Sequence, residues 1–95
     1  MKLYRDHQEY LQEALKDPKE AALYLNAAVE ENDPVLLVAA LADVARAHGI
    51  SRLAKKAALS RVGLHKIISK KGNPELKTFM SLVKASGLQL SFKAA

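Results

Sequence analysis

Two Asp-Pro pairs divide the first half of the chain into short helices. Asp17 and Asp33 are each followed directly by proline. An aspartate carboxylate can accept hydrogen bonds from the free N–H groups of a first helical turn, and proline at the first helical position has no N–H to leave unpaired. The helix that begins at Pro34 is predicted to end at His48, because Gly49 follows and glycine favours the left-handed conformation of a helix end. One long helix is therefore excluded, and several short ones are predicted.

Apolar residues recur at helical spacing along most of the remaining chain. The predicted helices cover residues 6–15, residue 18 to the Glu30-Glu31-Asn32 stretch, and residues 34–48, 51–58, 61–68 and 75–86. Residues 88–92 alternate between apolar and polar side chains, which is compatible with one short strand whose partner would come from a second copy of the chain. At 95 residues one domain is the default. We predict a single all-α domain over residues 1–95, a bundle of five or six helices with room for one short C-terminal strand.

The helix predicted over residues 34–48 is apolar on nearly every side. Between Val35 and Ala47 only Asp43 and Arg46 are polar. A helix without a polar face is usually buried. We therefore expect this helix either at the centre of the fold or at an interface between two copies of the chain.

Positive and negative charges are concentrated in different halves of the chain. Residues 1–45 contain four bases and nine acids, a net charge of −5, whereas residues 46–95 contain eleven bases and one acid, a net charge of +10. From Val44 to Pro74 there are eight bases and no acid. Such an asymmetry favours a polyanionic partner for the basic half. The alternative is a solvated basic face without a ligand, and charge alone does not decide between them.

The two short helices in the basic half meet the requirements of a helix-turn-helix. That motif needs a small residue where its helices cross, apolar contacts that fix the crossing angle, a tight turn and an exposed second helix. Ala54 is the small residue at the predicted crossing, and Ser60 is a favourable N-cap for the second helix. The apolar contacts are expected from Leu53, Ala57, Leu59, Leu64 and Ile67.

The remaining side chains of this helix pair are predicted to point outward. Those on the second helix are Arg61, Val62, His65 and Lys66. The bases expected to meet the phosphates of a nucleic acid are Arg52, Lys55 and Lys56 on the first helix and Lys70 and Lys71 after the second. Apolar residues inside and bases outside together predict a DNA-binding surface, although each side chain taken alone is also compatible with an ordinary solvated residue.

The helix pair and its flanks resemble a known family. The stretch SRLAKKAALSRVGLHKIISKKGNPELKTFMSLVKASGLQLSF is similar to helix-turn-helix domains of the Cro/phage-repressor type. Together with DPKEAALYLNAAVEENDPVLLVAALADVARAHGIS it resembles the addiction-module antidote proteins, the HigA-type antitoxins, over about residues 8–92. The resemblance implies a homodimeric antitoxin that neutralises a small basic toxin of the RelE/ParE-like type and represses its own operon by binding double-stranded operator DNA.

The resemblance also assigns roles to individual residues. Ser60, Arg61 and Val62 would begin the recognition helix and enter the major groove, where Arg61 can bind guanine for about 1–3 kcal/mol of discrimination. Val62 would contact a thymine methyl group, and His65 and Lys66 would reach bases or phosphates. The complete set of predicted DNA-binding residues is Arg52, Lys55, Ser60, Arg61, Val62, His65, Lys66, Lys70 and Lys71.

Two residues of the helix pair depart from the usual pattern of such motifs. Ala58 occupies the turn position at which glycine is common. If this residue is left-handed, alanine costs roughly 1 kcal/mol there. Gly63 lies inside the predicted recognition helix, where glycine costs roughly 1 kcal/mol relative to alanine. It either allows a close approach to the DNA backbone or is a tolerated weakness.

Several other classes of protein are not indicated. The chain has no cysteine, its three histidines lack metal-ligand spacing, and His48 is expected only at a helix end. No nucleophile, base and oxyanion donors combine into a catalytic site, so we expect no enzyme, no metal and no cofactor. No apolar run approaches the ~18–20 residues of a membrane span, and no signal peptide is visible. We therefore expect a cytoplasmic, nucleoid-associated protein that contacts no membrane.

Two other functions stay open at the level of sequence. One is a phage-type transcriptional repressor without a toxin partner. The other is a protein-interaction module, whose acidic half binds a basic partner and whose basic half has no affinity for DNA. In the antitoxin interpretation, residues 1–48 supply toxin or dimer contacts and residues 49–92 bind DNA. Residues 1–33 are expected to help hold the toxin, because they contain most of the acids.

Overall fold

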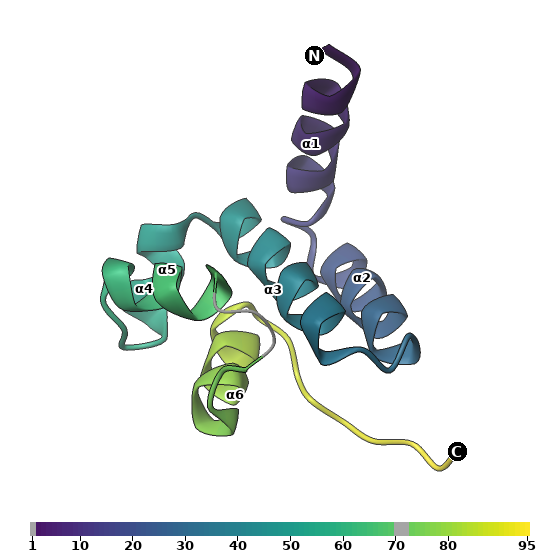
Figure 1. The fold of residues 1–95 in the computed structure, drawn as a ribbon, viewed down its shortest axis with the longest axis vertical. Helices are drawn as coiled ribbons and strands as arrows, with labels where there is room; N and C mark the ends of the chain where they lie inside the picture. Colours follow the sequence, from purple (N-terminus) through teal and green to yellow (C-terminus); the bar gives the residue numbers. More distant parts are fainter. Residues whose placement is uncertain (1, 70–72) are drawn as a thin grey trace.

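The chain folds into helices arranged around α3. The computed structural model describes residues 2–69 and 73–95. Within these ranges the helices are α1 (Lys2–Ala14), α2 (Pro18–Glu30), α3 (Pro34–His48), α4 (Ile50–Lys56), α5 (Arg61–Ser69) and α6 (Leu76–Ala85). α3 runs through the middle of the molecule, with α1 and α2 to one side and α4, α5 and α6 to the other (Figure 1). The predicted all-α class with five or six helices is confirmed.

Both Asp-Pro pairs start a helix as predicted. The Asp17 carboxylate accepts a hydrogen bond from the Lys19 N–H at 2.9 Å, and Asp33 accepts one from the Val35 N–H at 2.9 Å. Gly49 follows α3 with a φ of 94°, so this helix also ends where the glycine predicted. These interactions join residues within one helical turn, which is why the local sequence indicates them.

Two details near the ends of the chain differ from the prediction. α1 begins at Lys2 rather than at Asp6, because no proline or glycine between these residues interrupts the helix. Residues 2–69 and 73–95 contain no strand, and residues 88–92 follow α6 as an irregular segment (Figure 1). A strand needs a hydrogen-bonded partner, and no other segment of the described residues supplies one.

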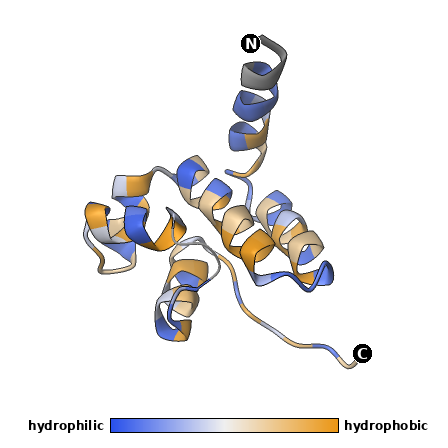
Figure 2. Ribbon diagram, in the orientation of Figure 1, coloured by the Kyte–Doolittle hydropathy of each residue, from blue (hydrophilic) through white to orange (hydrophobic). Residues whose placement is uncertain are grey.

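The hydrophobic core has two parts that share α3. The larger part joins α3 to α4, α5 and α6 and consists of Leu41, Ala42, Ala45, Leu53, Ala54, Leu64, Ile68 and Leu82. The smaller part lies beside α1 and α2 and consists of Leu15, Ala21, Val44 and Ala47. Figure 2 shows the predominantly apolar α3 between the more polar outer helices. Of the two positions expected for the helix over residues 34–48, its burial confirms the central one.

The first turn of α3 is less covered than the rest. Val35 and Leu36 are exposed, whereas most of the helix from Val38 onward is buried. No described helix is by itself long and apolar enough to cross a membrane. α3 and α4 reach that length and composition only together, and the chain bends by 102° between them.

Candidate nucleic-acid interface

α4 and α5 pack closely on each other and on α3. Leu53 of α4 and Leu64 of α5 are fully buried, and the small residue Ala54 is 2% exposed. The half-buried residues that pack against the same cluster include Ala57, Leu59 and Ile67. The apolar residues expected inside the helix pair are therefore confirmed as part of the core. Their packing determines which side chains of α5 face the solvent.

A left-handed residue ends the turn after α4. Ala58 has a φ of 58°. Its N–H donates to the Lys55 carbonyl at 3.2 Å, and the Leu59 N–H donates to the Ala54 carbonyl at 2.8 Å. These two hydrogen bonds form a Schellman motif, which satisfies carbonyls left free at the helix end. The left-handed conformation considered for Ala58 is thus present, at a cost of roughly 1 kcal/mol for alanine.

Ser60 caps the start of α5, as predicted. Its Oγ accepts a hydrogen bond from the Gly63 N–H at 2.9 Å. A Cβ atom at position 63 would lie only 2.9 Å from the same Oγ, so a larger residue there would push the Ser60 hydroxyl out of place. Gly63 therefore leaves room for the cap in its present geometry. The cap in turn determines where the first turn of α5 begins.

The described residues of the predicted DNA-binding set are all exposed. They are Arg52 and Lys55 on α4, and Ser60, Arg61, Val62, His65 and Lys66 on or next to α5; Lys56 on α4 is exposed as well. Lys70 and Lys71 lie outside the described residues. Residues four positions apart are neighbours on a helix surface, so Arg61 lies beside His65 and Val62 beside Lys66. The structure brings these four side chains together on one exposed face of α5.

The positive charges of α4 and α5 are not neutralised by acidic side chains of the described chain. Its ion pairs are Lys16–Glu13 at 3.2 Å and Arg46–Asp43 at 3.4 Å, both outside α4 and α5. The sequence from Val44 to Pro74 contains no acid that could pair with them. Exposed cations without acidic partners create a positive potential that attracts polyanions.

His48 lies where α3 meets α4. Its Nε2 is buried and has no hydrogen-bond partner among the residues that the structure describes. Burial lowers the pKa of His48 below its ordinary value of 6.5, and the charges of Lys56 and Arg52 lower it further. The sequence indicated only a helix-end role for this residue. Its position couples protonation of the imidazole to the charge of the neighbouring cations on α4.

A second polar feature joins α2 to α3 and was not predicted. The Tyr24 hydroxyl donates a 2.6 Å hydrogen bond to Asp43 Oδ2, and Arg46 pairs with Asp43 Oδ1 at 3.4 Å. Burial and the Asp43 carboxylate raise the pKa of Tyr24 to about 12. Because Tyr24 and Asp43 lie on different helices, no local spacing signals their contact. They border a groove of about 360 Å³ lined by Tyr24, Ala27, Ala28, Glu31, Leu36, Ala39, Ala40 and Asp43.

The chemistry available on α4 and α5 is that of binding. Within residues 2–69 and 73–95, no three His, Asp or Glu side chains are grouped so that they could hold a metal ion. The exposed Arg61 offers a planar fork of N–H donors, which matches the edge of a guanine or the oxygens of a phosphate. Val62 is exposed among the basic side chains of α5 and offers an apolar contact. The lysines supply positive charges for phosphates.

Comparison with known proteins gives the family of the chain. An uncharacterized protein of Haemophilus influenzae is 43% identical over 77 residues, which cover 81% of this chain and 79% of the relative. No solved structure is significantly similar to the chain. The family described as "Probable addiction module antidote protein" matches residues 6–94, which include all of α2 to α6 and most of α1. This protein therefore belongs to the family of probable addiction module antidote proteins.

Proposed function

We propose that this protein is the DNA-binding antitoxin of a toxin–antitoxin module, and that α5 enters the major groove of its operator. Membership of the antidote family supports the antitoxin role. One observation carries the DNA-binding part of the proposal. The Ser60 cap and the packing against α4 hold α5 in place. The outer face of α5 carries Arg61, Val62, His65 and Lys66, and its bases have no acidic partner among the described residues.

The DNA sequence would be recognised by the first turns of α5. The N-terminal residues of a recognition helix approach the base edges most closely. Arg61 binds guanine O6 and N7, a preference worth about 1–3 kcal/mol. Val62 contacts a thymine methyl group. His65 and Lys66, one turn further along, reach bases or phosphates.

Affinity would come mainly from phosphate contacts. Arg52 and Lys55 on α4, with Lys70 and Lys71 after α5, are the bases we assign to them. Each neutralised phosphate releases bound cations, so log K is expected to fall by about 0.9 per phosphate for each unit of log salt. A chain that neutralises about four phosphates thus binds DNA with a steep salt dependence.

We further propose that two copies bind one operator and repress the operon that encodes them. A symmetric dimer would place its two recognition helices in major grooves about 34–36 Å apart, one turn of the DNA. This role places the protein on the nucleoid in the cytoplasm.

The toxin would be a small basic protein of the RelE/ParE-like type, held by the acidic N-terminal half. Residues 1–45 have four bases against nine acids. The same region exposes Leu23 and Val29 on α2. Acids attract a basic partner and exposed apolar residues give it surface to bury, so residues 1–33 carry the two properties that such a contact needs.

The DNA-binding part is tested by selecting sequences from a random DNA pool and titrating the protein with the selected operator and a scrambled duplex. We expect a clear preference for the selected sequence and a steep loss of affinity with salt. Equal affinity for operator and scrambled duplex across the salt series would contradict the proposal.

The antitoxin part is tested separately by co-expression with a small basic protein encoded beside this one. We expect growth to be rescued by the wild-type chain and also by Arg61→Ala, because the toxin contacts are assigned to the other half. If neither the wild type nor Arg61→Ala rescues growth, the antitoxin role is contradicted. DNA binding without rescue would instead favour a phage-type repressor.

A further inference from the structure

We propose that residues 88–92, the C-terminal segment, form the dimer interface by pairing antiparallel with the same segment of a second copy, Leu90 opposite Leu90. The proposal rests on the homodimer in the proposed function and adds where its contact lies. It does not depend on whether the dimer binds DNA.

The backbone of the C-terminal segment has unused hydrogen-bonding groups. The Leu88 N–H donates to the Val83 carbonyl at 3.1 Å, which completes the end of α6. From Gln89 onward, the backbone forms no hydrogen bond with the part of the chain that the structure describes. Free N–H and C=O groups along an exposed segment are a template for another strand. The groups needed for a strand ladder are therefore present.

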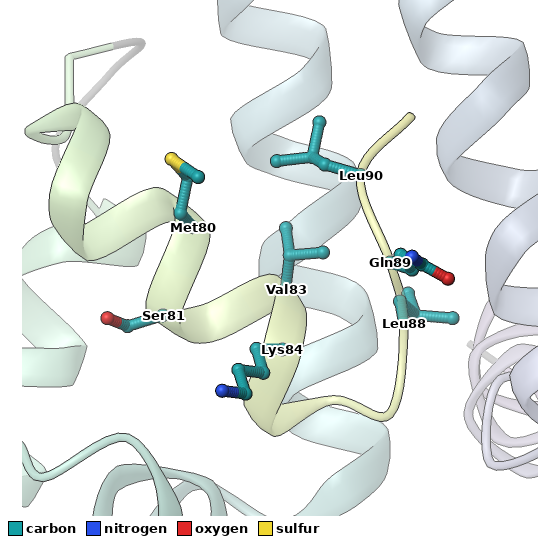
Figure 3. A pocket seen from close by; sticks show the side chains of 7 residues that line it. All are labelled: Met80, Ser81, Val83, Lys84, Leu88, Gln89 and Leu90. Carbon is teal, nitrogen blue, oxygen red and sulfur yellow. The ribbon is translucent and has the colours of Figure 1, made fainter. Parts of the chain in front are cut away.

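The apolar side chains of this segment lie against the helices but are incompletely covered. Leu88 packs against the smaller core beside α3. Leu90 points into a groove of about 340 Å³ that it shares with Met80 of α6 (Figure 3). Phe92 is 96% exposed and lines a groove of about 380 Å³ with Val29 of α2. A second strand laid beside the first would bring further apolar residues to these grooves.

The alternation of residue types specifies one register. Directly opposite residues of an antiparallel pair lie on the same face of the sheet. With Leu90 opposite Leu90, Leu88 lies opposite Phe92, and Gln89 lies opposite Ser91. Apolar residues then pair with apolar ones and polar residues with polar ones. A shift of one residue would pair each apolar side chain with a polar one.

A second copy of the chain also meets no electrostatic obstacle. The sequence from Ala85 to Phe92 contains no charge. In the proposed register Lys93 lies opposite Gly87, just after the C-terminal end of α6, where a positive charge is favoured. The C-terminal segment runs away from α4 and α5 (Figure 1), so pairing there leaves the candidate interface free.

Single cysteines test the register, because the native chain contains none. Opposite Cα atoms of an antiparallel pair are about 4.5–5.5 Å apart, within the range of a disulfide. Leu90→Cys is therefore expected to form a covalent dimer on mild oxidation. Gln89→Cys and Ser91→Cys are each expected to remain largely uncrosslinked alone, but to crosslink to each other when mixed. Equal crosslinking of Gln89→Cys alone and Leu90→Cys would overturn the register.

Sedimentation of the full chain tests the interface without a crosslink. We expect a dimer for the wild type and a monomer for Leu90→Glu, which places two carboxylates opposite each other. Gln89→Glu is the matched control and stays dimeric, because its partner is Ser91. Far-ultraviolet circular dichroism should show the same helix content in both variants. A monomeric wild type, or a Leu90→Glu variant that remains fully dimeric, would overturn the proposal.

The DNA titration separates this inference from the proposed function. If the wild type sediments as a dimer and Leu90→Cys crosslinks, but the wild type shows no operator preference, the interface is kept and the DNA-binding proposal is removed. If the wild type prefers its operator but sediments as a monomer, and Leu90→Cys does not crosslink, the DNA-binding proposal is kept and the interface is removed.

Discussion

The helix pair α4–α5 and the group α1–α3 present different kinds of surface. α4 and α5 bury most of their large apolar side chains and expose bases, with Val62 as an exposed apolar residue among them. α1–α3 carry most of the acids of the chain. They also expose the large apolar side chains Tyr10, Leu23, Val29, Val35 and Leu36. The cores of both regions share α3, so the difference lies in what each region leaves available to a partner.

This difference indicates two kinds of recognition in one small protein. Attraction between exposed charges acts over about 10 Å at 0.1 M salt and weakens as salt is added. Burial of apolar surface acts only on contact and needs a partner of matching shape. The basic helix pair α4–α5 is therefore suited to a polyanion, and the acidic, partly apolar group α1–α3 is suited to a protein. The predictions below test this division.

The largest expected effect is on stability, from a substitution in the core under the basic pair. Leu64 is fully buried, so Leu64→Ala is expected to lower the free energy of unfolding by about 2–5 kcal/mol. Leu23→Ala on α2 is the matched control, and because Leu23 is 65% exposed we expect a change within about 0.5 kcal/mol. Urea denaturation measures both. Equal losses would show that Leu23 supports the fold rather than a partner contact.

The next effect distinguishes, within α4 and α5, the residue assigned to recognising the DNA sequence from the residue assigned to binding phosphates. Arg61→Ala is expected to reduce the preference for operator over scrambled DNA by about 1–3 kcal/mol. Lys55→Ala is expected to weaken binding to both duplexes alike and to lower the salt slope by about 0.9. Titrations at several salt concentrations distinguish the two. A loss of operator preference in Lys55→Ala alone would reverse the assigned roles.

A smaller effect on the free energy of unfolding is expected at the two left-handed residues that follow α4 and α6. Ala58 has a φ of 58° and Gly87 a φ of 80°. Ala58→Gly should raise the free energy of unfolding by roughly 1 kcal/mol, because glycine adopts this conformation without steric cost. Gly87→Ala should lower it by a similar amount, since a Cβ there meets nothing within 4 Å and only the backbone conformation changes. Thermal melts measure both, and an unchanged melting temperature in Ala58→Gly would contradict the account of the turn.

The smallest expected effect concerns pH, because a single partly exposed imidazole carries it. The pKa of His48 is lower in the folded protein than its ordinary value of 6.5, mainly through burial and then through Lys56 and Arg52. Well above pH 6.5 the imidazole is neutral in both states and has no effect. As the pH falls below 6.5, the unfolded chain binds the proton more readily, so stability decreases until the folded pKa is passed. Denaturation from pH 7.5 to 5 should show a steeper loss in the wild type than in His48→Gln; parallel curves would argue against this role.

Much of the fold could be predicted because its signals are local. Asp17 and Asp33 each bond an N–H within the next turn, and Ser60 does the same at the start of α5. The periodic apolar residues of the helix pair, such as Leu53 and Leu64, were placed correctly in the core. Cap preferences and helical periodicity act over a few residues and do not depend on the rest of the chain.

Other features of the candidate sites could not be predicted because they depend on which helices meet. The Tyr24–Asp43 hydrogen bond joins residues on α2 and α3. His48 Nε2 has no hydrogen-bond partner among the described residues, and the pKa of His48 is lowered, only because α3 packs beside α4. The sequence also did not indicate that the first turn of α3 would be exposed. When a helix is apolar along its whole length, its sequence does not show which end the neighbouring helices cover.

The sequence by itself thus determined the short helices, their order, and the separation of acidic and basic halves. Helix caps, apolar periodicity and charge depend only on the order of residues along the chain. The tertiary structure alone decided that Tyr24 bonds Asp43, that His48 Nε2 has no partner among the described residues, and that Phe92 stays uncovered. Each of these depends on distances between atoms that come together only when the helices pack, and such distances have no local signature in the sequence.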